Sequence, residues 1–446
     1  MTNYSIEIKH LSTKVPNLQR WCLDYPRDKD VVALTELTEQ GIVFQGWVLL
    51  VNQPLPELYL LQGEQKVLLT VNRNRPDVIQ AVLNESASEH PQLCCGFRYQ
   101  LPITAADFVI GVQIDQQDYP LLEGKVVGAF QVLRGKADWL FLDNDTNKSV
   151  EQYTGQLLME RSQRKAWQKY FAGFKKLVVE LDIPSAMLMA PAKESVYSQY
   201  YPFEKAKLTA TDELLKLVPS HFPLCYPVAE LKNAKERTFR VTDTHWSVHG
   251  AAEASKLVAE KLGIAKTAID AVFSEDKFQL RKHIGDLGNK VFPPASHEEA
   301  VLISYNYKKF IIYDNQLPNF GRALVIHNET ALLVGQLLVF GSSSAYSMLD
   351  YLSRIFSTVT LVHTAGNIDV GLVKQLRPEY LLTQTNARFV IKAPSLAYSL
   401  QEGITEKLQT LELAAWQQQA KAVTAQAING GKVAQVLNQY FTQPIG

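Results

Sequence analysis

Short apolar or alternating runs, separated by turn-forming residues, dominate the first 125 residues of the chain. Four such runs cover residues 42–51, 58–61, 66–71 and 108–114. Runs of this length between clusters of Gly, Pro and Asn are typical of β-strands. We therefore predict a β-sandwich accessory domain over residues 1–125. Its aromatic residues, such as Trp21, Trp47 and Tyr59, either pack in the core or bind carbohydrate by stacking on sugar rings.

After residue 125 the pattern changes to strands that alternate with helices. Residues 135–142 form a turn followed by an apolar run, and residues 151–181 carry apolar side chains at helical spacing. The apolar run 185–190 ends before a proline, as a buried parallel strand does. This alternation predicts an α/β layer fold.

The same alternation returns near the C-terminus. Strands are predicted at 337–340, 358–363 and 380–383, and helices at 345–356 and 369–376. Right-handed crossovers would place these strands in one parallel sheet, with their loops at its carboxyl edge. We assign residues 126–399 to this α/β domain. The tail, residues 400–446, is predicted to be helical and to pack on the sheet or on a partner chain.

Composition limits what the protein can do. The chain has 446 residues, of which 46% are hydrophobic, so at least two domains are expected. Forty-five basic residues balance forty-five acidic ones, which argues against nucleic acid as a partner. No run approaches the roughly 18 to 20 apolar residues of a membrane-spanning helix. The start of the sequence lacks a secretory signal pattern, so a cytoplasmic location is expected.

The four cysteines show no metal-ligand spacing. Cys22, Cys94, Cys95 and Cys225 are expected to be free thiols. No metal site is predicted.

The first candidate for chemistry is Ser343, which follows the apolar run 336–340 in the segment Gly341-Ser342-Ser343-Ser344. A serine at a strand-to-helix turn can act as a nucleophile, and the free backbone N–H groups of the helix start can stabilise an oxyanion. Ser342 and Ser344 are weaker candidates for the same role. The alternative is purely structural, since Ser342 or Ser343 could cap the helix.

The second candidate is the pair Asp243 and His245 in Asp243-Thr244-His245-Trp246. A serine hydroxyl needs a neighbouring imidazole to take its proton, and a carboxylate usually orients that imidazole. Spacing of two residues lets Asp243 hold one ring nitrogen while the other faces a serine. Trp246 would supply an apolar wall. The alternative is a surface aspartate beside a packed histidine.

Two further polar residues have open roles. Asn328 follows Val325-Ile326-His327, where a strand would end near the sheet edge, and it would donate to an oxyanion or form a turn. Tyr346 lies one turn after Ser343, where it would line the pocket or pack.

These motifs, in their order along the chain, resemble the SGNH-hydrolase-like domain of alginate O-acetyltransferases of the AlgJ/AlgX type. The resemblance rests on Asp243-Thr244-His245-Trp246, His249-Gly250-Ala251 and Gly341-Ser342-Ser343. Supporting stretches bring it to roughly residues 130–395; they are residues 135–142, 153–155, 190–197, 377–380 and 386–389. The order Asp, His, Ser also distinguishes this type from ordinary SGNH esterases, in which the serine comes first.

The resemblance implies an SGNH-like parallel sheet and a triad with Ser343 as nucleophile, His245 as general base and acid, and Asp243 as the orienting carboxylate. An acetyl group would pass from a donor, or a donor protein, to Ser343 and then to a hydroxyl of a polysaccharide. The acetyl donor is a co-substrate, and no bound cofactor is expected. Relatives of this type work in the periplasm, in contrast to the location expected from the start of this sequence.

Two departures from the family pattern affect the site. Ser342 stands where the family usually has Asp or Thr, and Ala387 stands where it commonly has Glu. Asn386 and Arg388 flank that second position and remain candidates for substrate binding, although a structural ion pair is an equal explanation for Arg388.

We therefore expect a carbohydrate O-acetyltransferase that modifies an exopolysaccharide or a surface glycan. An O-acetylesterase is the close alternative, because it shares the acyl-serine step. A non-catalytic glycan-binding or assembly protein, in which Ser343 only caps its helix, is the alternative from another class.

Overall fold

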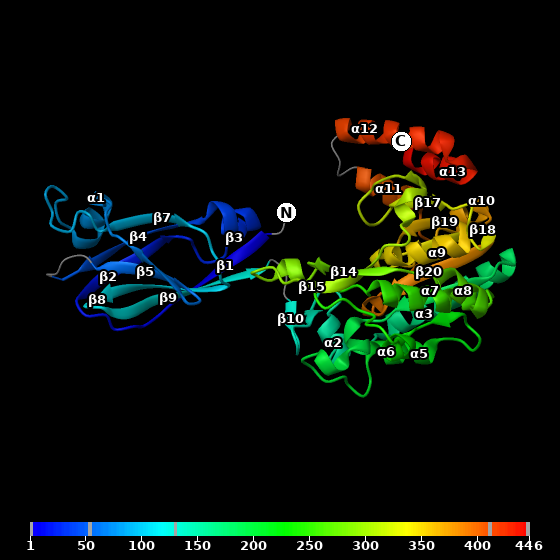
Figure 1. The fold of residues 1–446 in the computed structure, drawn as a ribbon, viewed down its shortest axis with the longest axis horizontal. Helices are drawn as coiled ribbons and strands as arrows, with labels where there is room; N and C mark the ends of the chain where they lie inside the picture. The colour runs from blue at the N-terminus through cyan, green and yellow to red at the C-terminus, as the bar shows by residue number, and fades with distance from the viewer. Residues whose placement is uncertain (1–2, 52–55, 129–131, 409–412, 443–446) are drawn as a thin grey trace. The chain divides into compact units, whose positions relative to one another are not determined.

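The computed structural model describes residues 3–51, 56–128, 132–408 and 413–442. The chain forms two compact units (Figure 1). One consists of Met1–Val132 with Ile284–Ser296, and the other of Leu133–His283 with His297–Gly446. The returning segment belongs to the first unit because Phe292 enters its core and the Tyr4 hydroxyl donates to the carbonyl oxygen of Asn289 at 2.8 Å.

The first unit is a sandwich of two antiparallel sheets, as the sequence predicts. The larger has the order β3 (Asp30–Ala33), β1 (Asn3–His10), β9 (Gln117–Gly128), β8 (Asp107–Ile114), β5 (Glu57–Gln62), β6 (Gln65–Leu69). The smaller has the order β2 (Leu18–Tyr25), β4 (Ile42–Leu50), β7 (Gly96–Leu101). Short helices connect the strands: η1 (Glu36–Gln40), α1 (Pro76–Val78) and η2 (Ile79–Leu83).

Side chains from both sheets fill one core between them. Phe44 and Val48 of β4 meet Leu60 of β5 there. Trp47 and Tyr59 are 8% and 3% exposed, so these two rings serve packing and present no face to a sugar.

The second unit is built on a seven-stranded, mostly parallel sheet, which confirms the predicted α/β fold. Its order is β13 (Leu224–Cys225), β12 (Ser185–Ala190), β20 (Tyr380–Asn386), β18 (Leu333–Gly341), β19 (Phe356–His363), β17 (Ala323–His327), β16 (Ile311–Asp314). Neighbours are parallel from β13 to β19, whereas β17 and β16 run antiparallel to their neighbours. Two small two-stranded sheets also occur: β10 (Val132–Arg134) with β11 (Leu140–Leu142), and β14 (Phe278–His283) with β15 (His297–Leu302), which run antiparallel.

Helices cover both faces of this sheet. They are α2 (Ser149–Tyr153), α3 (Arg161–Leu181), α4 (Lys193–Val196), η3 (Ser198–Tyr200), α5 (Ala210–Leu217), α6 (Val228–Asn233), α7 (Val248–Lys261), α8 (Lys266–Phe273), η5 (Tyr307–Phe310), η6 (Ser343–Met348), α9 (Leu349–Ile355), α10 (Val370–Leu376), η7 (Ala387–Phe389), α11 (Leu400–Leu408), α12 (Leu413–Asn429) and α13 (Gly431–Thr442). In the first unit, η4 (Gly288–Lys290) lies within the returning segment.

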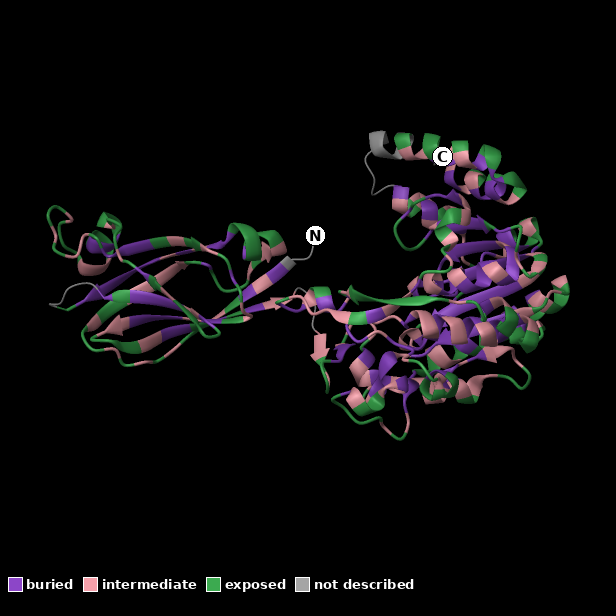
Figure 2. Ribbon diagram, viewed as in Figure 1, coloured by how far each residue is buried: buried purple, intermediate pink, exposed green. Residues whose placement is uncertain are grey.

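The strand side chains divide between two cores because successive residues point to opposite faces. On β18, Leu337 and Val339 pack with α7, α8 and α9, whereas Leu338 and Phe340 pack with α3, α10 and the C-terminal helices. Figure 2 shows the resulting buried layer along the strands. The strands are thus covered on both faces, which explains their unbroken apolar runs.

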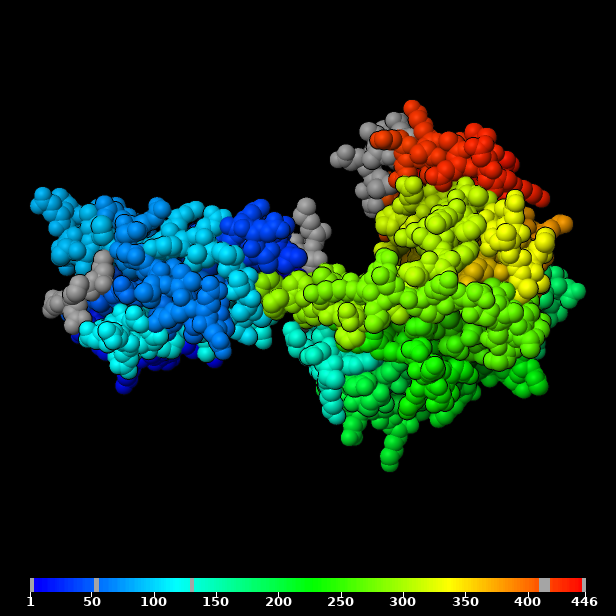
Figure 3. Space-filling view, in the orientation of Figure 1, coloured from blue at the N-terminus to red at the C-terminus, as the bar shows by residue number. Residues whose placement is uncertain are grey.

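The C-terminal helices pack on this unit rather than extending from it. Val423 of α12 and Leu437 of α13 enter the same core as Phe340. The backbone N–H of Asp314, at the end of β16, donates to the side-chain oxygen of Gln426 at 3.0 Å. Figure 3 shows α12 and α13, in red, against the segment that contains β16 and β17.

The structure corrects two helix predictions. The single helix expected over residues 151–181 is interrupted between α2 and α3, because Gly155 adopts a φ of +72° and Glu160 starts a new helix with a capping box to Gln163. The helix expected from Ala345 begins two residues earlier as η6 and ends at Ile355, where β19 follows directly. In the described ranges no helix combines the length and hydropathy needed to cross a membrane.

Gly250 allows a close approach that a larger residue would block. It lies in the first turn of α7, and a Cβ atom there would meet the carbonyl oxygen of Thr238 and lie 2.8 Å from the Cβ of Trp246. We predict that Gly250→Ala lowers the free energy of unfolding by about 2–3 kcal/mol through overpacking. Gly335→Ala in β18 is the matched control, since its Cβ would meet Tyr380 at an ordinary 3.5 Å. Urea unfolding that gives equal stability for both variants would contradict this account.

Candidate active site

Ser343 is the first residue of η6, directly beyond the carboxyl end of β18. Ser342 caps this helix, and its Oγ accepts a hydrogen bond from the Ser344 N–H at 3.3 Å. The capping role that could account for a serine here therefore falls to Ser342. Ser343 is half-buried, and its hydroxyl is available for another partner.

The two serines beside Ser343 anchor the turn to β20. The backbone N–H and the hydroxyl of Ser342 both donate to the side-chain oxygen of Gln384, at 2.6 and 2.9 Å. The Ser344 hydroxyl donates to the side-chain oxygen of Asn386 at 3.1 Å. All four anchoring residues are buried, so the position of the turn is closely defined. Ser342 and Ser344 thus hold the turn instead of facing a substrate.

The loop before α7 brings His245 to this turn. The Nδ1 atom of His245 lies 2.7 Å from Asp243 Oδ1, and its Nε2 atom lies 2.9 Å from Ser343 Oγ. Because a carboxylate only accepts, Nδ1 carries the proton and Nε2 accepts from the serine hydroxyl. The structure therefore joins the three residues that the sequence analysis selected in one hydrogen-bonded chain.

Asp243 is held more firmly than the histidine that it orients. The side chain of Asp243 is 7% exposed and that of His245 is 28% exposed. Oδ1 of Asp243 also accepts a hydrogen bond from the His245 backbone N–H at 2.9 Å. Burial opposes ionisation, but the hydrogen bonds from His245, together with the charge of Arg240, outweigh it and hold the pKa of Asp243 below its usual range. Asp243 is therefore a carboxylate at neutral pH.

Three further residues, Lys193, His283 and Arg240, support this carboxylate. Nζ of Lys193 donates to the carbonyl oxygens of Leu140, Val241 and Asp243, at 2.6, 2.9 and 2.9 Å. On the outer oxygen of Asp243, His283 Nε2 lies at 3.3 Å and Arg240 Nη1 at 3.6 Å. Lys193 lies within the stretch 190–197 that supports the family resemblance. No local pattern singles out His283, because it comes from the end of β14.

Trp246 connects the histidine loop to the serine turn. Its indole N–H donates to the Ser344 carbonyl oxygen at 3.1 Å and to the Ser347 hydroxyl at 2.7 Å. The ring is 1% exposed. Its role is thus to lock two loops together, not to form the open apolar wall that the sequence suggested.

Asn328 lies away from Ser343, at the opposite edge of the sheet. Since β17 runs antiparallel to β19, the end of β17 meets the start of β19, and the Asn328 backbone N–H donates to the carbonyl oxygen of Ser357 at 2.8 Å. Its side chain donates to the Ser353 carbonyl oxygen at 2.9 Å. An oxyanion role for Asn328 is therefore wrong. The prediction failed because the sequence does not reveal the direction of β17.

The remaining candidates lie on the serine side of the sheet. The Tyr346 hydroxyl is 3.2 Å from Nδ1 of His363, whose position in β19 pairs with Gly341 of β18. Burial and the charges of Arg322 and Lys407 lower the pKa of His363 to about 4, so the ring is neutral at neutral pH. Tyr346 packs against this residue.

Asn386 and Arg388 occupy different surroundings although only one residue separates them. Asn386 is 8% exposed and belongs to the anchor of the serine turn. Arg388 has its Nη1 atom 3.9 Å from Asp145 Oδ2 and lines a separate cavity.

Comparisons with known proteins identify the family of this chain. Residues 132–354, half of the chain, match the family model described as the SGNH hydrolase-like domain of the acetyltransferase AlgX. No curated protein matches the chain. Solved structures similar to part of it include Bacillus cereus PatB1 with a sulfonyl adduct, at 14% identity, a TM-score of 0.44, and coverage of 59% of this chain and 98% of that one.

Two further solved structures are similar. The O-acetyltransferase domain of Pseudomonas putida AlgJ shows 16% identity and a TM-score of 0.37, with coverage of 62% of this chain and 99% of that one. Pseudomonas aeruginosa AlgX shows 15% identity and a TM-score of 0.34, with coverage of 59% and 66%.

The buried ammonium of Lys193 generates a stability prediction. Replacing it by methionine leaves three carbonyl oxygens without this donor, so we expect Lys193→Met to lower the free energy of unfolding by about 2–3 kcal/mol. Lys148→Met, at a surface ion pair, is the control and should change it by less than about 0.5 kcal/mol. Denaturant unfolding measures both. A Lys193→Met protein as stable as the control would show that these hydrogen bonds do not hold the loop.

Proposed function

Because the chain belongs to the SGNH hydrolase-like acetyltransferase family of AlgX, we propose that it transfers acetyl groups to hydroxyls of a polysaccharide through an acetyl-serine on Ser343. The observation that carries this proposal is the position of His245, with Nδ1 on Asp243 and Nε2 on Ser343. This arrangement supplies a nucleophile, a base and an orienting carboxylate.

In the first half of the reaction, Ser343 Oγ attacks the carbonyl carbon of an acetyl ester while His245 Nε2 takes the hydroxyl proton. The backbone N–H of Ser343, the first residue of η6, stabilises the oxyanion of the tetrahedral intermediate. When this intermediate collapses, the ester bond breaks and the leaving alcohol takes the proton from His245. The product is acetyl-Ser343.

In the second half, a sugar hydroxyl attacks the acetyl carbon and gives its proton to His245. Collapse returns the proton to Ser343 Oγ and releases the O-acetylated sugar, so ping-pong kinetics follow. Water in place of the sugar would release acetate, which is the esterase reaction. The mechanism uses the acetyl donor as a co-substrate and requires no bound cofactor.

The serine assignment has a direct test. We predict that Ser343→Ala reduces acetate release from p-nitrophenyl acetate by about 10³-fold or more, since the nucleophile is lost. The flanking variant Ser344→Ala loses one hydrogen bond to Asn386 and should lose less than about tenfold. Retained turnover in Ser343→Ala, with the normal thermal unfolding temperature, would exclude Ser343 as nucleophile.

The carboxylate has a separate test. Asp243→Asn keeps the size of the side chain but stabilises the wrong imidazole tautomer, so kcat should fall by about 10³- to 10⁴-fold. The pKa of Asp243 is held below its usual range, and the carboxylate therefore stays ionised as the pH rises from about 5 to 9. The ionisation of Asp243 should therefore produce no step in the wild-type pH profile within this window. A variant that keeps more than about a tenth of wild-type kcat would refute the orienting role.

Transfer is distinguished from hydrolysis by mass. Protein, p-nitrophenyl acetate and a panel of oligosaccharides should yield sugars heavier by one acetyl group, and the product should be absent with Ser343→Ala. Acetate as the sole product with every oligosaccharide would show an esterase instead.

A further inference from the structure

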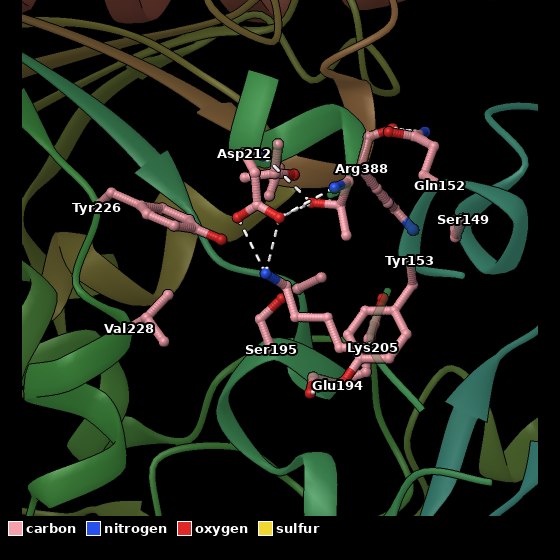
Figure 4. A pocket seen from close by; sticks show the side chains of 14 residues that line it. Ser149, Gln152, Tyr153, Glu194, Ser195, Lys205, Asp212, Tyr226, Val228 and Arg388 are labelled. Atoms are coloured by element: carbon pink, nitrogen blue, oxygen red, sulfur yellow. Dashed lines mark hydrogen bonds and ion pairs between the residues drawn. The ribbon is translucent and has the colours of Figure 1, made fainter. Parts of the chain in front are cut away.

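A separate cavity opens at the carboxyl edge of the same sheet (Figure 4). Its volume is about 300 Å³, and none of Ser343, His245 and Asp243 lines it. The walls come from α2 and from segments that follow three neighbouring strands: β12, β13 and β20. Among the lining residues are Glu194, Ser195, Lys205, Asp212, Tyr226 and Arg388.

Two short segments join this cavity to the proposed triad. Lys193, whose Nζ donates to the Asp243 carbonyl oxygen at 2.9 Å, directly precedes the lining residue Glu194. Asn386, which accepts from Ser344 at 3.1 Å, is followed by the lining residues Ala387 and Arg388. Residues that line the cavity are therefore chain neighbours of residues that support the triad.

The cations in the cavity are already paired with carboxylates. Lys205 Nζ donates to both oxygens of Asp212, at 2.9 and 2.8 Å, and Figure 4 shows this pair at the centre of the view. Arg388 faces Asp145 at 3.9 Å. Because each positive charge has its partner, the cavity offers no net charge to a phosphate or a carboxylate.

The other lining groups suit a ligand that both donates and accepts hydrogen bonds. Ser195 and Tyr226 contribute hydroxyls, and the rings of Tyr153 and Tyr226 contribute apolar faces. Glu194 adds a carboxyl group, and burial raises its pKa against the opposing effects of its own backbone N–H, Lys193 and Arg388. A sugar ring has hydroxyls that donate and accept and a C–H face that packs on aromatic rings.

We propose that this cavity is an acceptor subsite that binds an uncharged sugar ring of the polysaccharide, next to the residue that receives the acetyl group. The proposal rests on the proposed function, since it assigns a place to the acceptor of that reaction. It goes further by choosing a neutral ring over an acidic or phosphorylated one.

The test compares acetyl transfer with hydrolysis. The donor is p-nitrophenyl acetate, and the acceptors are a neutral hexose tetrasaccharide and a hexuronic acid tetrasaccharide of the same linkage. In the double variant Ser195→Ala/Tyr226→Phe, two hydroxyls are lost, so the ratio of transfer to hydrolysis with the neutral acceptor should fall about tenfold or more. The wild-type protein should favour the neutral acceptor by about tenfold.

The matched control lies at the other edge of the sheet. Lys374 forms an exposed ion pair with Glu180 at 3.0 Å, in the segment that leads into β20. Lys374→Gln should leave both the transfer and the hydrolysis rate unchanged.

Each other outcome has a defined meaning. A ratio in the double variant within twofold of wild type, or transfer and hydrolysis that fall together, would overturn the subsite. Preference for the hexuronic acid acceptor would overturn the choice of a neutral ring. Hydrolysis that depends on Ser343 without transfer to either acceptor would instead refute the transferase proposal, and the subsite with it.

Discussion

The buried ammonium of Lys193 is the interaction on which the site depends. A charged group so far from water is stable only where its donors are used, and here Nζ donates to three backbone carbonyl oxygens. Two of them belong to the segment that carries Asp243, and the third to β11. The position of the carboxylate is thus set by hydrogen bonds from Lys193, which follows β12, to these main-chain oxygens. His245 then follows from Asp243, because Oδ1 accepts from both its ring and its backbone N–H.

The turn that carries Ser343 is held by the side-chain amides of two residues and not by a buried charge. Gln384 and Asn386, at the end of β20, accept from the serines on either side of Ser343. This explains why serine is acceptable at position 342, where the family usually has Asp or Thr. A small hydroxyl side chain can cap η6 and donate to Gln384 at the same time. Ser342 departs from the family pattern but still makes the hydrogen bonds that anchor the turn.

Sequence reasoning succeeds where the information is local and fails where it depends on partners distant in the chain. The apolar run 185–190 predicts β12 with both ends correct, since a covered parallel strand is apolar throughout. The positions of Asp243, His245 and Ser343 also follow from short motifs and the family resemblance. In contrast, the direction of β17, and with it the location of Asn328, is decided by pairing with β19. The contribution of His283 is invisible for the same reason, because it arises from tertiary contact alone.

Asp243 is buried, whereas His245 and Ser343 are partly open to solvent, and this bears on the choice between transfer and hydrolysis. The carboxylate is shielded, His245 is 28% exposed and Ser343 is half-buried. Water can therefore reach the proposed acetyl-serine. Transfer must then depend on holding a sugar hydroxyl near the acetyl carbon at high effective concentration. Such positioning requires a binding surface fixed relative to the triad, and the cavity beyond β20 is lined by chain neighbours of the residues that support Asp243 and Ser343.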